Sequence, residues 1–137
     1  MNETAQKLAS LEVSENNSVD DGIEIDSFQT RTEKGTIVNF LIYKMDSCFF
    51  VWVGLGPIPP TMPQLVMGAV NKFDTSSGVI SSVLAHYDGD TQTAQSMSRR
   101  LSKRTNKIFY ITSTIPKGDN DDLIAFVEQQ IISRIQA

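Results

Sequence analysis

Residues 91–112 read TQTAQSMSRRLSKRTNKIFYIT and predict an amphipathic helix that runs into a β-strand with no glycine between them. Ala94, Met97 and Leu101 recur at positions i, i+3 and i+7, so they share one helix face, which we expect to point at a core. Residues 108–111 are β-branched or aromatic, and this composition favours a strand. The segment therefore predicts a domain in which a helix packs on a sheet.

Cations crowd the C-terminal half of this helix and the junction after it, where they complement the helix dipole. They are Arg99, Arg100, Lys103, Arg104 and Lys107. The plainest interpretation is a solvated helix end, and the next is a contact with an acidic protein surface. We expect no nucleic acid, because the sequence pI is about 4.9 and the aromatic residues nearby belong to an apolar strand.

Composition predicts one domain in a reducing compartment. The chain has 137 residues, of which 40% are apolar, enough for a real core. Cys48 is the one cysteine, so no internal disulfide can form. The longest apolar run, residues 48–53, is far shorter than the roughly 18 residues that a membrane span needs. We expect a cytoplasmic protein, with the nucleus as a second location, and no membrane partner.

The N-terminal region is acidic. Residues 1–26 hold seven acids against one lysine. Few apolar side chains accompany these charges, so residues 1–22 are predicted to be a flexible acidic tail, and residues 23–137 a single domain. The tail either keeps the protein soluble or shields the basic helix until a partner displaces it.

The rest of the chain predicts an α+β fold with the element order β-β-β-β-β-α-β-α. Apolar and β-branched runs mark strands at residues 23–28, 36–43, 48–53, 64–71 and 79–85, all before the basic helix. An acidic first turn at residues 119–122 begins a final helix. The apolar stripe of that helix is Leu123, Ile124, Val127, Ile131 and Ile135. We expect an antiparallel sheet of about six strands with two helices on one face.

Two of these strands, at residues 36–43 and 48–53, carry apolar side chains on both faces. In an antiparallel sheet with one face in water, apolar and polar side chains would alternate along each strand. One set of side chains is Val38, Phe40, Ile42, Phe49, Val51 and Val53, and the opposite set is Ile37, Leu41, Tyr43, Phe50 and Trp52. Two helices can cover only one face, so the other needs a cover. A partner chain is the favoured cover, with Leu41, Tyr43, Phe50 and Trp52 as the predicted interface; loops or the N-terminal segment are the alternative.

Catalytic, metal and cofactor motifs are missing from the sequence. His86 is the one histidine, so no histidine pair can bind a metal, and no Gly-Lys-Ser/Thr phosphate loop occurs. Residues 88–91, Asp-Gly-Asp-Thr, lack the rest of a calcium loop and are typical of a turn that caps a helix. We expect a protein that is not an enzyme and has no cofactor.

Three blocks of sequence carry a family resemblance. They are residues 46–54 (DSCFFVWVG), Leu84 with Gly89, Asp90 and Thr91, and residues 98–107 (SRRLSKRTNK). In this order they resemble the proteasome assembly chaperone 4 family, over about residues 23–134. The resemblance implies a non-enzymatic chaperone that pairs with proteasome assembly chaperone 3, largely sheet to sheet, and promotes assembly of the α-ring of the 20S core particle. It gives no role to residues 1–22 or to the proline-rich loop at residues 57–60.

Under this resemblance the five cations become candidates for contact with α-type subunits of the proteasome. It leaves open whether the chain forms a homodimer in isolation. A small adaptor or trafficking-type interaction domain of the same mixed architecture would also show an apolar sheet face and a basic helix. The identity of the partner separates these two hypotheses.

Overall fold

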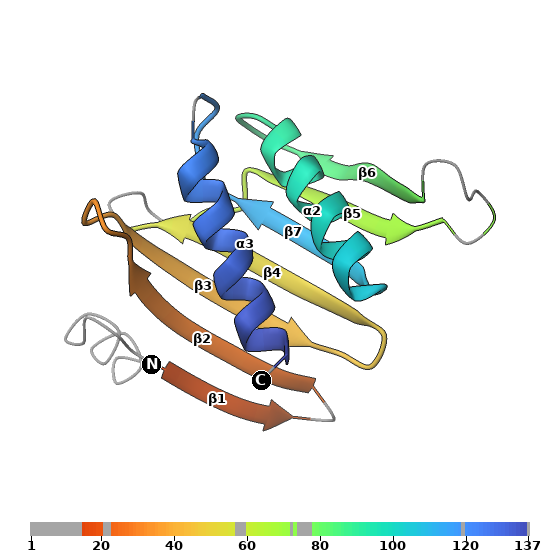
Figure 1. Cartoon of the computed structure of the whole chain (residues 1–137), viewed down its shortest axis with the longest axis horizontal. Coiled ribbons are helices and arrows are strands. Elements are labelled where there is room, and N and C mark those ends of the chain that lie inside the picture. The colour runs from red at the N-terminus through yellow and green to blue at the C-terminus, as the bar shows by residue number, and fades with distance from the viewer. Residues whose placement is uncertain are drawn as a thin grey trace.

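The computed structural model describes residues 15–20, 23–56, 60–71, 73, 78–118 and 120–136, with the backbone alone for residues 15–20. In chain order the elements are β1 Glu15–Asp20, β2 Ile23–Arg31, β3 Ile37–Lys44, β4 Cys48–Leu55, β5 Gln64–Val70, β6 Val79–His86, α2 Gln92–Thr105, β7 Ile108–Ser113 and α3 Asp121–Gln136. From β2 onward this order is the predicted one. Figure 1 shows one sheet with both helices on the same side of it.

The strands form a single sheet in the order β1-β2-β3-β4-β7-β5-β6. It is mostly antiparallel, as predicted, but the β4–β7 pair is parallel. The predicted antiparallel sheet therefore contains one parallel pair. After β6, helix α2 carries the chain back across the sheet, and such a crossover allows β7 to enter beside β4 in the same direction.

Strand β1 is a seventh strand, and it lies inside the segment that the sequence assigned to an acidic tail. It pairs antiparallel with β2, from Glu15 opposite Phe28 to Asp20 opposite Ile23. Strand pairing uses backbone groups, so a segment with few apolar side chains can still join the edge of a sheet. The predicted flexibility of residues 1–14, 21 and 22 lies outside the described residues.

The core lies between the sheet and the two helices, and the predicted inward faces are confirmed. Val38, Val51 and Val53 are fully buried from the strands, as are Ala94 and Leu101 from α2. The predicted stripe of α3 also packs here: Val127 and Ile131 are fully buried, while Leu123, Ile124 and Ile135 pack against the core at its margin. Burial of this apolar surface is the main stabilising term of the fold.

Helix α2 lies close to β5 at Gly68, which makes this approach possible. A Cβ at Gly68 would sit 2.5 Å from the backbone oxygen of Ser98, closer than atoms can pack. Because the obstacle is backbone, no side-chain rotation would relieve it. The glycine thus sets the distance between α2 and the sheet.

The beginning of α2 is stabilised by Asp90, one of the residues predicted to cap it. Its carboxylate accepts hydrogen bonds from the backbone N–H of Gln92 at 2.9 Å and of Thr93 at 3.3 Å. Partial burial raises the pKa of the Asp90 carboxyl, but these bonds and the nearby Lys117 charge outweigh it and hold the pKa below its ordinary 3.8. The residue 88–91 turn is therefore a helix cap, as expected.

Candidate partner-binding face

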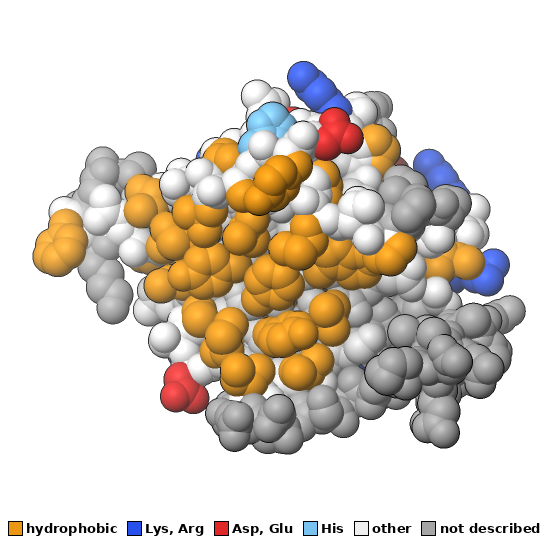
Figure 2. Space-filling model, turned by 180° about the vertical axis from the view of Figure 1, so that it is seen from behind, with side chains coloured by type: hydrophobic (Ala, Val, Ile, Leu, Met, Phe, Trp, Pro, Cys, Tyr) orange, Lys and Arg blue, Asp and Glu red, His pale blue; other side chains and the backbone are white. Residues whose placement is uncertain are grey.

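The sheet face that points away from the helices is apolar, and we call it the open face. Partly buried apolar side chains of β2, β3, β4, β5 and β7 contribute to it. These residues are Ile25, Leu41, Tyr43, Phe50, Trp52, Leu65, Met67 and Tyr110. Figure 2 shows hydrophobic side chains gathered across the middle of this side of the molecule. No described helix covers it.

One row of side chains crosses the open face from strand to strand. The register places Ile25 opposite Tyr43, Tyr43 opposite Phe50, Phe50 beside Tyr110, and Tyr110 opposite Met67. The Tyr43 and Phe50 rings meet edge to face, with centroids 5.7 Å apart. Aromatic neighbours in this geometry stabilise each other beyond the area that they bury. The row forms a continuous apolar ridge.

A second row lies beside it and contains the one tryptophan of the chain. Leu41 is opposite Trp52 on β4, with Ser27 on its other side. The Trp52 indole Nε1 donates a hydrogen bond of 2.9 Å to the backbone oxygen of Thr61, so its polar group is satisfied. The remaining indole surface is available for an apolar contact.

Polar uncharged groups border this apolar centre. Gln29 and Asn39 lie opposite each other on β2 and β3, and the Gln29 Nε2 donates to the Asn39 Oδ1 at 2.7 Å. Every open-face position of β3, β4, β5 and β7 carries an uncharged residue. An aromatic centre, a polar border and few charges are the features of a protein–protein interface.

The structure brings the four predicted interface residues Leu41, Tyr43, Phe50 and Trp52 together on this face. Their role in binding is not tested by the geometry and stays a prediction. Sequence reasoning did not name the contributions of β2, β5 and β7, which are Ile25, Leu65, Met67 and Tyr110. Their alternation with buried neighbours was a usable signal, but it needed the order of the strands to show that they share a face with β4.

The five predicted cations separate into two groups. Arg100 donates from Nε and Nη2 to the Glu128 carboxylate of α3, with a shortest N–O distance of 2.6 Å. These hydrogen bonds raise the pKa of the Arg100 guanidinium, against the opposing effect of its partial burial. Arg99 donates from Nη1 to the Ser81 Oγ at 2.7 Å. Both arginines therefore bind within the chain.

The other three cations are exposed. Lys103 and Arg104 lie in the last turn of α2, and Lys107 follows Asn106, which closes the helix with a backbone φ of 58°. Lys103 and Arg104 belong to α2, on the helix side of the sheet, whereas the open face lies on the opposite side. The molecule thus presents a basic surface and an apolar surface on different sides.

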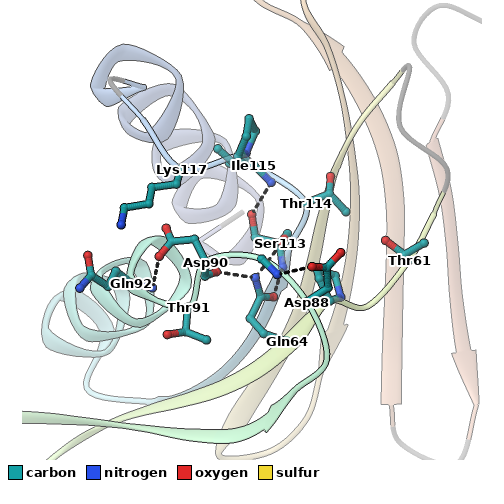
Figure 3. Close-up of a pocket in the computed structure, with 13 residues that line it drawn as sticks. Thr61, Gln64, Asp88, Asp90, Thr91, Gln92, Ser113, Thr114, Ile115 and Lys117 are labelled. Atoms are coloured by element: carbon teal, nitrogen blue, oxygen red, sulfur yellow. Dashed lines mark hydrogen bonds between the residues drawn. The ribbon is translucent and has the colours of Figure 1, made fainter.

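A cavity of about 650 Å³ opens at one end of the sheet, between the start of α2 and the loop after β7 (Figure 3). Buried Gln64 lies at its base, where Nε2 donates to the backbone oxygens of Asp90 and Ser113, and Oε1 accepts from the Ser113 N–H. Its hydrogen-bonding groups are thus used in joining β5, β7 and the α2 cap. The side chain acts as a structural joint.

Among the described residues, no three His, Cys, Asp or Glu side chains gather as metal ligands would. His86 lies at the end of β6, with Nε2 at 2.8 Å from the Gly89 oxygen. No helix in the same residues is long and apolar enough to cross a membrane.

Comparisons with known proteins point to one family. The family described as Proteasome assembly chaperone 4 matches residues 37–115, more than half of the chain. No curated protein matches closely enough to be named as a relative. Nine chains of solved structures match. One comes from a crystal structure of a novel chaperone complex for yeast 20S proteasome assembly, with a TM-score of 0.53, 13% identity, and coverage of 92% of this chain and 97% of that chain. At this identity the likeness shows the fold alone.

Proposed function

The chain belongs to the proteasome assembly chaperone 4 family, and from this premise we propose that it pairs with proteasome assembly chaperone 3 and promotes assembly of the α-ring of the 20S core particle. The open face is the observation that carries the proposal. It supplies an apolar surface that a partner would remove from water, and burial of apolar surface is the dominant favourable term in most protein associations. The proposed location is the cytoplasm, with the nucleus as a second one.

The geometry of the open face favours another sheet as the occupant. Apolar faces of two sheets pack about 10 Å apart with their side chains interdigitated. The aromatic row from Tyr43 through Phe50 to Tyr110 forms a ridge that such packing would bury. A partner of similar architecture, with its own apolar sheet face, fits this surface better than a single peptide does.

The basic surface at the end of α2 supports a second contact. We propose that Lys103, Arg104 and Lys107 face acidic side chains of an α-type subunit. Because Lys103 and Arg104 are exposed on α2, on the other side of the sheet, a partner on the open face leaves them accessible. The chaperone pair and an α-type subunit can therefore be bound at the same time. Arg99 and Arg100 contribute less, since each already binds a side chain of this protein.

Co-expression with proteasome assembly chaperone 3 from the same source tests the pairing. A tag on one chain allows purification, and mass measurement gives the stoichiometry. The proposal predicts a stable 1:1 complex for the native chain and its loss for Leu41→Asp, because an unpaired charge would be buried in the interface. Ala125→Asp is the matched control, since it adds the same charge on the exposed side of α3.

Two results would contradict the proposal. A soluble chain that does not bind proteasome assembly chaperone 3 would favour the adaptor or trafficking-type domain instead. A complex that Leu41→Asp leaves intact, with the variant folded, would mean that the partner binds elsewhere. A homodimer in the absence of the partner, sensitive to the same substitution, would show that the open face accepts a second copy of the chain.

A further inference from the structure

The ring of Trp52 lies over Gly54, a neighbour on the same strand that has no side chain. A Cβ placed on Gly54 would be 2.3 Å from the Cη2 atom and 2.4 Å from the Cζ2 atom of the Trp52 ring. Residues 52 and 54 share a face of β4, because side chains two apart in a strand point the same way. The benzene edge of the indole therefore occupies the space that any other residue at position 54 would fill.

The five-membered ring of the indole is fixed as well. Its Nε1 donates a 2.9 Å hydrogen bond to the Thr61 oxygen, beyond the end of β4. The ring is thus held at two points, by the bare backbone of Gly54 and by the Thr61 carbonyl. A side chain held this way has few rotamers left to lose when a partner arrives.

We propose that Gly54 and the Thr61 carbonyl are positioning groups that hold Trp52 in its binding orientation before the partner arrives. This inference rests on the proposed function, since it assigns Trp52 as the anchor of the partner contact. Tryptophan is enriched among the residues that dominate interface energies. Ordering a side chain at an interface costs affinity, and a group that is already ordered avoids that cost.

The chain offers a direct readout, because Trp52 is its one tryptophan. In the free protein, Gly54→Ala is expected to move the ring into solvent, with a red-shifted emission and faster quenching by acrylamide. The fold should survive, since the obstacle is the outer edge of a partly exposed side chain and not backbone. Ser27→Ala, at a neighbouring open-face position, is the control and should leave the emission unchanged.

A double-mutant cycle tests whether Gly54 acts through Trp52. We expect Trp52→Ala to weaken the affinity for proteasome assembly chaperone 3 about 30-fold or more, as for an interface hot spot. Gly54→Ala alone should weaken it about tenfold, and in the Trp52→Ala background less than about twofold. Trp52→Phe keeps an aromatic ring but loses the Thr61 hydrogen bond, so its affinity should fall between those of the native chain and Trp52→Ala.

The outcomes separate this inference from the proposed function. If the native chain binds and Gly54→Ala changes the emission but not the affinity, the positioning role is wrong and the proposed function stands. Equal losses of affinity from Gly54→Ala in the native and Trp52→Ala backgrounds would also overturn the positioning role. If the native chain does not bind proteasome assembly chaperone 3, the proposed function fails, and with it the binding role of Trp52. If Gly54→Ala does not fold, a native affinity of Trp52→Phe would show that the Thr61 hydrogen bond does not position the ring, and would overturn the inference.

Discussion

Arg100 and Glu128 join the two helices through hydrogen bonds from the guanidinium to both carboxylate oxygens, at 3.1, 2.9 and 2.6 Å. The Glu128 side chain is 11% exposed, whereas the Arg100 side chain is 51% exposed. A nearly buried carboxylate on α3 thus has its charge balanced by a cation that reaches across from α2. Such pairs are more costly to break than to replace as a whole.

Truncation of Arg100 should therefore destabilise the fold. We expect Arg100→Ala to lower the free energy of unfolding by about 1–3 kcal/mol, because the nearly buried Glu128 carboxylate would lose its main hydrogen-bond donor. Urea unfolding measures the change. Lys103→Ala, at an exposed position of the same helix, should cost less than about 0.5 kcal/mol. Equal effects of the two substitutions would contradict the structural role of Arg100.

A methyl group at Gly68 should be far more damaging than one at Gly54. At Gly68 the obstacle is the backbone of Ser98, so α2 must move away from the sheet. At Gly54 it is the Trp52 ring, which can turn aside. We expect Gly68→Ala to lower the free energy of unfolding by about 2 kcal/mol or more, as overpacking of a core does, with a smaller loss for Gly54→Ala. Thermal or urea melts of both variants decide the point, and a reversed order would refute it.

The Asp90 cap should make part of the stability depend on pH. Its pKa lies below 3.8 in the folded protein, so the folded state binds fewer protons than the unfolded state as pH falls through this range. The stabilisation is then complete above about pH 4 and is lost in stronger acid. Asp90→Ala should lower the free energy of unfolding by about 1 kcal/mol at pH 7, and the difference should shrink near pH 3.

Asp88, two residues earlier, provides the control for the cap. Its carboxylate accepts a hydrogen bond from the backbone N–H of the next residue, Gly89, which lies outside α2. Asp88→Ala should therefore cost the fold less at pH 7 than Asp90→Ala does. A difference between Asp90→Ala and the native chain that stays constant from pH 7 to pH 3 would show that the carboxylate charge plays no part in the cap.

The basic surface predicts a binding step that depends on salt. We expect replacement of Lys103 and Arg104 together by glutamine to weaken binding to α-type subunits about tenfold at low salt, and much less near 0.5 M salt, where exposed charges are screened. Lys34→Gln, an exposed cation on the turn between β2 and β3, is the control. Pull-down titrations with single α-type subunits measure both. If this pair of substitutions leaves the affinity unchanged, the helix end is merely solvated and does not contact the α-type subunit.

Local pattern was enough to predict the inward faces of the strands and helices. Met97 and Val127 are buried as their spacing indicates, and Phe50 and Trp52 lie opposite the core because burial alternates along β4 from Cys48 to Val53. These predictions succeed because the side chains that face the core recur at the regular spacing of a strand or a helix. They required no knowledge of which strands are neighbours.

Features that depend on distant segments were not predictable in this way. The entry of β7 between β4 and β5 follows from the path of α2 over the sheet, so neither the parallel pair nor the contribution of Tyr110 to the open face appears in a local pattern. Likewise Arg100 reads as a surface cation, because its partner Glu128 is 28 residues away. Strand β1 was missed because backbone pairing leaves no apolar signature.

We propose that the open face binds proteasome assembly chaperone 3, and the environment of Trp52 tests this pairing most directly. The chain labelled with 5-fluorotryptophan gives one ¹⁹F resonance, because it has one tryptophan. On addition of one equivalent of unlabelled proteasome assembly chaperone 3, we predict that this resonance shifts and loses its sensitivity to solvent isotope and to a soluble paramagnetic quencher. A complex that forms while the resonance and its solvent exposure stay those of the free chain would contradict the account.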